Sequence, residues 1–236
     1  MNITRPYTSD YFDSKNYLRK REHKIRKSGW LLDIARSYHP AITQMLEVGC
    51  SVGNTLEAAA QRNIAALGID ISDYAVNFCR EKGYNAENKT LRDLRQLGMG
   101  FDLVFMQHVL EHFTDPFEIL GICHELLNKD GLILILVPNS TFRPAGRLRE
   151  KHRFYSKEGV GAEHFVYFNY DNLSRVLKTC GFEVVQKNYP LRVSSHDHPL
   201  FFLNRFFRRS MALIGQDQEL LVVARKDVKT FRISDL

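Results

Sequence analysis

The chain lacks any apolar stretch long enough to cross a membrane. Its longest apolar run is Leu132–Val137, whereas a membrane-spanning helix needs about 20 such residues. Residues 1–27 also contain no apolar core of the kind that a secretory signal peptide carries. These absences predict a soluble, cytoplasmic protein.

Cysteine is scarce, and its spacing excludes two common kinds of site. The four cysteines are Cys50, Cys79, Cys123 and Cys180, and no two of them form a C-x-x-C pair. A structural zinc site and a redox pair of that type are therefore not expected. Isolated cysteines in a reducing compartment are usually small buried apolar residues, which is the role we predict for all four.

Net charge is unevenly distributed along the 236 residues, which together carry +6. Residues 1–40 carry a net charge of +5, residues 41–142 carry −6 and residues 143–236 carry +7. This pattern favours a catalytic domain with basic additions that could meet an anionic partner, although a solvated charged surface gives the same pattern. We predict an N-terminal helical extension over 1–40 and one domain over 41–236.

Apolar periodicity predicts alternating strands and helices, which is typical of a doubly wound parallel sheet of the Rossmann-like α/β class. The segment Leu91–Gly100 has no clear period, and Asp130-Gly131 is typical of a turn. The expected helices are Lys15–Tyr38, Thr55–Arg62, a helix from Ser72 to near Gly83, Pro116–Asn128 and Tyr170–Cys180. The expected strands are Met45–Val48, Ala65–Ile69, Tyr84–Glu87, Phe101–Met106, Leu132–Val137, Phe182–Lys187 and Glu219–Arg225.

A glycine-bearing loop, Leu46-Glu47-Val48-Gly49-Cys50-Ser51-Val52-Gly53, leaves the first expected strand. Asp70 ends the second strand, 21 residues after Gly49. A carboxylate there can accept hydrogen bonds from both hydroxyls of a ribose, which fits a dinucleotide or adenosylmethionine. A dinucleotide loop would need glycines at positions 51 and 54, where Ser51 and Asn54 stand.

The order acid-x-Gly-x-x-x-Gly resembles motif I of the class I S-adenosylmethionine-dependent methyltransferases. That family usually carries a further glycine at the position of Ser51, and we expect cofactor binding to survive this small replacement. A longer stretch, Phe101–Pro116 continuing to Pro138-Asn139, resembles the "FDLV…LEH…DP…LL-x-x-GG…PN" pattern of ubiquinone-biosynthesis-type enzymes of the methyltransferase 11/23 group. His164–Phe168 and Leu177–Phe182 match the later part of that pattern.

The resemblance covers about residues 40–190. It implies a seven-stranded sheet that is mostly parallel, with an antiparallel last strand and helices on both faces, and S-adenosylmethionine as the methyl donor. The residues that it implies around the cofactor are Glu47, Gly49, Cys50, Ser51, Gly53, Asp70, Ile71, Gln107 and His108. Asp93 could accept a hydrogen bond from the adenine amino group, or could equally be a surface residue in a turn.

Three residues after the fourth strand are candidates for work on the methyl acceptor. His108, Glu111 and His112 would share one face of a helix. In the ubiquinone O-methyltransferases the matching sequence E-x-x-E-H is associated with a divalent cation, but His108 replaces the first Glu here, and we expect no metal. Our hypothesis is that His108 or His112 acts as a base on the acceptor, because histidine titrates near neutral pH. His164 is a second candidate base, or a structural histidine.

Two segments are candidates for closing over the acceptor: a basic loop over about 140–165 and an insertion over 188–218. Within the insertion, Phe201–Arg209 combines aromatic and cationic residues, which suits a lid, a dimer interface, a peripheral membrane contact or a buried helix with a charged rim. We favour a lid. Aromatic residues at Tyr7, Tyr11 and Phe12 could close the same site.

The leading hypothesis is O-methylation of a small-molecule acceptor, or of an acceptor linked to a lipid or a glycan. An RNA methyltransferase is the alternative that the basic ends suggest, but no RNA-binding module is recognisable, and we do not expect a nucleic-acid partner. A non-catalytic adenosylmethionine-binding protein is the other alternative, which Ser51 favours. Monomer and dimer both stay open.

Overall fold

The computed structural model describes residues 21–96, 98–141, 164–188 and 219–227. The helices of these ranges are α2 (Arg21–Tyr38), α3 (Asn54–Ala60), α4 (Asp73–Glu81), α5 (Leu91–Arg95), the 3-10 helix η1 (Leu110–His112), α6 (Pro116–Leu126) and α8 (Tyr170–Thr179). The strands are β1 (Gln44–Val48), β2 (Ala65–Asp70), β3 (Ala86–Asn88), β4 (Phe101–Gln107), β5 (Leu127–Pro138), β6 (Phe182–Asn188) and β7 (Glu219–Lys226).

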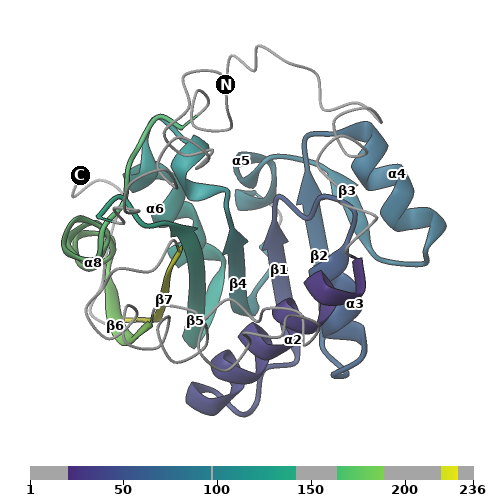
Figure 1. Cartoon of the computed structure of the whole chain (residues 1–236), viewed down its shortest axis with the longest axis horizontal. Helices are drawn as coiled ribbons and strands as arrows, with labels where there is room; N and C mark the ends of the chain where they lie inside the picture. The colour runs from purple at the N-terminus through teal and green to yellow at the C-terminus, as the bar shows by residue number, and fades with distance from the viewer. Residues whose placement is uncertain (1–20, 97, 142–163, 189–218, 228–236) are drawn as a thin grey trace, which may run out of the picture.

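The strands form one seven-stranded sheet in the order β3-β2-β1-β4-β5-β7-β6 (Figure 1). The neighbours from β3 to β5 are parallel, so their carboxyl ends reach the same edge of the sheet. The last strand, β7, lies between β5 and β6 and is antiparallel to both. This arrangement confirms the doubly wound, mostly parallel sheet that the sequence predicts.

Helices cover both faces of the sheet, as expected, because successive side chains of a strand point to opposite sides. In β5, Ile133, Ile135 and Val137 pack in one core with α5, α6 and α8. The alternate residues Leu132 and Leu134 pack in a second core with α2 and α3. The uninterrupted apolar run of β5 is therefore explained by burial on both sides.

Helix α2 belongs to the second core. Leu31, Leu32 and Ala35 are completely buried in it. The hydroxyls of Ser28 on α2 and Thr55 on α3 are 2.9 Å apart and form a buried hydrogen bond. The domain boundary at residue 40 stays a prediction, but the helix before that boundary packs as closely as those after it.

The structure differs from the expectations between β3 and β5. A short helix, α5, forms where the sequence has no clear period, because Thr90 and Asp93 cap each other in a capping box. The turn expected at Asp130-Gly131 is an irregularity inside β5, where the pairing with β4 shifts between Phe101↔Leu127 and Leu103↔Leu132. Asp130 lies there with a φ of 63°.

All four cysteines are free and buried, as predicted. Within the described ranges, no helix combines the length and the apolar composition that crossing a bilayer demands. The residues before Arg21, most of the basic loop and the insertion predicted to act as a lid lie outside the described residues, and so do the aromatic candidates at Tyr7, Tyr11, Phe12 and Phe201–Arg209.

Candidate functional site

The candidate site lies where the chain reverses its direction across the sheet. Strand β1 has β2 on one side and β4 on the other. The chain after β1 continues toward β2 and the chain after β4 continues toward β5, so the two connections start at neighbouring carboxyl ends and lead in opposite directions across the sheet. These are the upper ends of the strands in Figure 1. The two loops touch, since a Cβ on Gly49 would lie 2.6 Å from Cγ2 of Val109. Open α/β sheets bind ligands at such a switch point.

The loop after β1 turns tightly around three residues with left-handed backbone. Gly49, Ser51 and Gly53 have φ values of 71°, 51° and 72°. Glycine adopts this conformation without cost, whereas a serine is strained in it. At Gly53 a side chain would also meet Sγ of Cys79 at 2.9 Å. The structure therefore explains the two glycines, and it places Ser51 at a third position that suits glycine.

Asp70, at the end of β2, holds this loop to the start of α4. Its Oδ2 accepts the N–H of Ser51 at 2.8 Å, and its Oδ1 accepts the N–H of Ser72 at 2.9 Å. Burial raises the pKa of the Asp70 carboxyl, while these backbone hydrogen bonds oppose the rise. Each carboxylate oxygen has a second lone pair that a ribose hydroxyl could use. Ile71, the next residue in the chain, is 39% exposed.

Two further predicted cofactor residues have their side chains below the loop. Burial raises the pKa of the Glu47 carboxyl well above its usual value, against a hydrogen bond with Thr55. The thiol of Cys50 is also buried. Its hydrogen bond with Cys79 is the main cause that raises the pKa of this thiol, and burial is the second. These side chains support the loop from the protein core. Within the described residues, Oε2 of Glu47 has no hydrogen-bond partner.

Arg21 of α2 clamps the loop from outside, a contact that the sequence analysis missed. Its guanidinium donates to the carbonyl of Val52 at 2.7 Å and to Oδ1 of Asn54 at 3.2 Å. It also pairs with Glu57 at 2.6 Å, and Tyr84 donates to the same carboxylate oxygen at 2.8 Å. Nothing in the local sequence indicates this contact, because Arg21 lies 31 residues before Val52.

Asp93 and Gln107 lie at element ends. Oδ2 of Asp93 accepts from the N–H and the hydroxyl of Thr90, at 2.7 and 2.8 Å, and these bonds lower the pKa of this exposed carboxyl. Its adenine contact stays a prediction, with one of its oxygens committed to the cap of α5. Gln107 is half-buried at the carboxyl end of β4, paired with Leu136 of β5.

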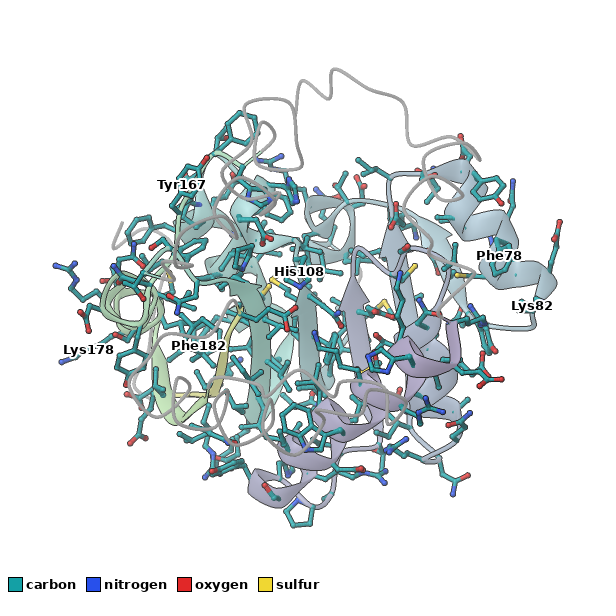
Figure 2. The ribbon with its side chains drawn as sticks, viewed as in Figure 1. Phe78, Lys82, His108, Tyr167, Lys178 and Phe182 are labelled. Atoms are coloured by element: carbon teal, nitrogen blue, oxygen red, sulfur yellow. The ribbon has the colours of Figure 1, made fainter. Side chains whose placement is uncertain are left out.

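The expectation that His108, Glu111 and His112 share a helix face is wrong. The chain turns sharply after β4, with His108 at a φ of 56°, and the following 3-10 helix contains only three residues. The N–H of His108 instead donates to the carbonyl of Leu136 in β5 at 2.8 Å. Nδ1 of its ring nevertheless lies 3.6 Å from Oε1 of Glu111, one of the two residues that it was expected to accompany. Figure 2 shows His108 near the upper ends of the central strands.

His108 belongs to an ion network that reaches α2. Its Nε2 lies 2.8 Å from Oε1 of Glu219, whose carboxylate is bound by Nζ of Lys27 at 2.7 and 2.9 Å. Burial alone would lower the pKa of His108, but Glu111 and Glu219 outweigh it and raise the pKa to about 9. Burial would likewise raise the pKa of Glu219, but Lys27 and His108 hold it below its usual value.

Glu111, His112 and His164 form a compact cluster beside this network. The carbonyl of Glu111 accepts the N–H groups of Phe165 and Val166, at 2.9 and 3.3 Å, which brings the segment after residue 163 against η1. Nε2 of His164 lies 3.9 Å from Oε1 of Glu111. The rings of His112 and His164 meet edge to face with centroids 4.7 Å apart. His164 therefore joins Glu111 and His112, and the ring of His108 lies near both Glu111 and Glu219.

A model of the methyltransferase domain matches residues 15–187 of the chain. The ubiquinone biosynthesis O-methyltransferases of Haemophilus ducreyi and Caulobacter vibrioides are 28% and 31% identical to the chain, over 111 and 106 residues. Each alignment covers 42% of this chain, and the chain spans 47% and 42% of the two relatives' lengths.

The fold is similar to the crystal structure of a SAM-dependent methyltransferase from Archaeoglobus fulgidus. That structure is 20% identical, with a TM-score of 0.67, and the match covers 92% of this chain and 99% of that one. Because the domain model spans most of the described sheet and the cofactor loop, the chain belongs to the methyltransferase-domain family, in its class I S-adenosylmethionine-dependent group.

Proposed function

We propose that this chain transfers a methyl group from S-adenosylmethionine to an oxygen atom of a small-molecule acceptor, or of an acceptor linked to a lipid or a glycan. The observation that carries the proposal is the contact between the loop after β1 and the loop after β4 at the switch point of the sheet. A cofactor held by the first loop would present its methyl group toward the residues of the second. The O-methyltransferase relatives support oxygen as the atom methylated.

The backbone of the first loop is preorganised for the cofactor. Asp70 already holds Ser51 and Ser72 through their N–H groups, so the carboxylate is fixed before a ribose arrives. Ile71, exposed next to it, offers an apolar surface against which an adenine ring could lie. A fixed carboxylate loses little conformational entropy on binding, which favours affinity.

Methyl transfer from a sulfonium is a displacement in line with the breaking bond, so orientation and exclusion of water supply much of the catalysis. An acceptor hydroxyl must also lose its proton before or during attack. With its pKa raised to about 9, His108 is protonated at neutral pH and is a poor base. We therefore assign the base role to His112 or His164, beside Glu111.

The test is to incubate the protein with methyl-labelled S-adenosylmethionine and a panel of acceptors that differ only in carrying a hydroxyl or an amine. We expect label on hydroxyl acceptors, and loss of the transfer in Asp70→Ala. A panel of phenols, glycans and lipid-linked sugars covers the proposed acceptor classes. Folded RNA in the same assay tests the alternative that the basic ends suggest.

Label that appears only on amines or only on RNA would overturn the choice of oxygen. Binding of S-adenosylhomocysteine without transfer to any acceptor would favour a non-catalytic binding protein. Titration calorimetry with S-adenosylhomocysteine separates these outcomes, because it reports the cofactor site without needing an acceptor.

A further inference from the structure

Two cysteines that lie far apart in the sequence meet beneath the cofactor loop. Cys50 belongs to the loop itself and Cys79 to α4, and both are buried in one small apolar cluster. Their thiols are hydrogen-bonded to each other. The sequence has no C-x-x-C pair, but the fold brings these two sulfur atoms into contact.

The sulfur of Cys79 also contacts the backbone of the cofactor loop. Its thiol donates to the carbonyl of Ser51 at 3.2 Å. A Cβ on Gly53 would lie 2.9 Å from the same sulfur. Because the N–H of Ser51 donates to Asp70, this one residue is held on one side by the carboxylate expected at the ribose and on the other side by a thiol.

We propose that Cys50 and Cys79 form a reversible disulfide that acts as a redox switch of S-adenosylmethionine binding. In the reduced protein the thiol of Cys79 holds the carbonyl of Ser51. A disulfide sulfur carries no hydrogen, so oxidation removes this hydrogen bond. The covalent bond also draws the two sulfur atoms closer than a hydrogen bond does. That movement strains the hydrogen bonds of the Cys50 backbone with Ile69 and Gly53, which measure 3.0 and 2.9 Å.

Cys79 is the thiol that reacts first. The hydrogen bond from Cys50 lowers the pKa of the Cys79 thiol, although burial opposes this effect. The same hydrogen bond, together with burial, raises the pKa of the Cys50 thiol. Because the thiolate is the nucleophile in thiol oxidation, Cys79 attacks the oxidant and Cys50 closes the disulfide.

The oxidant that the proposal requires is a peroxide. The Cys79 thiolate attacks hydrogen peroxide, the O–O bond breaks, and a sulfenic acid forms as hydroxide leaves and takes up the proton that the thiol lost. The Cys50 sulfur then attacks the sulfenic sulfur and gives its proton to the departing hydroxyl group, which leaves as water. Overall the two thiols lose two electrons and two protons, and one peroxide becomes two molecules of water. A dithiol reductant reverses the reaction by thiol–disulfide exchange.

The other two cysteines provide a control for the access of the oxidant. Cys123 and Cys180 are as deeply buried as Cys50 and Cys79, but they lie in the core that contains α6 and α8. The thiol of Cys180 donates to the carbonyl of Phe117 in α6. Burial raises the pKa of the thiols of Cys123 and Cys180. We therefore expect peroxide to react at the pair beneath the loop.

The experiment uses the full chain and S-adenosylhomocysteine, so it depends on the cofactor site and not on the proposed acceptor. Reduced protein is treated with hydrogen peroxide, and the free thiols are counted after denaturation. We expect the count to fall from four to two and peptide mapping to find Cys50 linked to Cys79. The calorimetric affinity for S-adenosylhomocysteine should fall by about tenfold or more, because a hydrogen bond to the loop is lost and others are strained. A dithiol reductant should restore it.

Cys79→Ser is the decisive variant, because a hydroxyl can still donate to Ser51 but cannot form a disulfide. Its affinity for S-adenosylhomocysteine should stay within about threefold of the wild type and should not respond to peroxide. Cys180→Ala is the matched control and should respond as the wild type does. If melting shows that Cys79→Ser does not fold, Cys50→Ala makes the same test of the peroxide response.

Reciprocity between oxidation and binding gives a second measurement. If oxidation weakens binding, the cofactor favours the reduced form by the same factor. Saturating S-adenosylhomocysteine should therefore raise the midpoint reduction potential of the disulfide by about 30 mV for each tenfold difference in affinity.

Four outcomes would overturn the proposal. They are wild-type protein that keeps all four thiols in peroxide, a disulfide between Cys123 and Cys180 in place of the expected one, a peroxide response that persists in Cys79→Ser, and a midpoint potential that S-adenosylhomocysteine does not move.

Discussion

Replacing Ser51 with glycine should stabilise the cofactor-free protein. Ser51 has a φ of 51°, and its buried Oγ has no hydrogen-bond partner within the described residues. A left-handed backbone costs a non-glycine residue about 1–2 kcal/mol. A buried hydroxyl left without a partner costs about 1–3 kcal/mol. Glycine offsets about 0.5–1 kcal/mol of this stabilisation, because it gains more conformational entropy on unfolding than serine does.

The balance is an increase of at least about 1 kcal/mol in the free energy of unfolding. For a chain of this size that increase raises Tm by about 2–4 °C per kcal/mol. The hydrogen bond from the N–H of residue 51 to Asp70 does not involve the side chain, so it should survive the replacement. Thermal and urea unfolding of the cofactor-free protein measure the change.

Two variants separate the contributions. Ser51→Ala removes the hydroxyl and keeps the strained backbone, so it should give part of the gain. Asn63→Gly changes an exposed residue with a φ of 54°, and asparagine tolerates that conformation, so its effect should be close to zero. A Ser51→Gly protein that melts at or below the wild-type temperature would refute the reasoning, since Ser51 would then make a stabilising contact that outweighs its strain.

Other predictions concern the residues around the loop and the ion network. Asp70→Asn should weaken S-adenosylhomocysteine binding by about tenfold or more in calorimetry, since hydrogen bonds to a charged group contribute about 1.5–3 kcal/mol; unchanged affinity would contradict the ribose contact. Arg21→Met should weaken the same binding by about tenfold, because it removes the hydrogen bond from the guanidinium to the carbonyl of Val52 in the cofactor loop. Arg26→Met, an exposed control on the same helix, should not weaken it. Folding raises the pKa of His108 from 6.5 to about 9, so its contribution to stability is complete below about pH 6.5 and is lost as pH rises through 9. The difference in urea midpoint between wild type and His108→Asn should therefore shrink over that range, and a difference that grows with pH would contradict a raised pKa.

Much of the fold could be predicted because the apolar pattern is strong where burial is complete. β5 is apolar at every position from Leu132 to Val137 and is buried on both faces. α5 could not be predicted, since only Leu91 and Leu94 of its residues are buried and its capping box decides its start. The irregularity at Asp130 depends on how β5 pairs with β4, which is not a local property of the sequence.

The cofactor loop could also be predicted, because its glycines are required by the local backbone conformation at Gly49 and Gly53. The cluster beyond β4 could not. The helical spacing of His108 and His112 assumed a helix, whereas the chain turns at His108 and forms a three-residue 3-10 helix. Glu219, which pairs with His108, lies 111 residues further along the chain, after a long insertion. Long-range pairing of this kind leaves no periodic signal.

The position of β7 also bears on the order in which the molecule can be assembled. β7 comes last in sequence among the strands of the described residues, yet it lies between β5 and β6. As a ribosome extends the chain, β6 emerges before the strand that must separate it from β5. Likewise, the ion pair between Lys27 of α2 and Glu219 cannot form until the chain has been extended by a further 192 residues. Contacts between such distant residues slow folding, so the nascent domain should keep an open sheet edge until synthesis has passed β7.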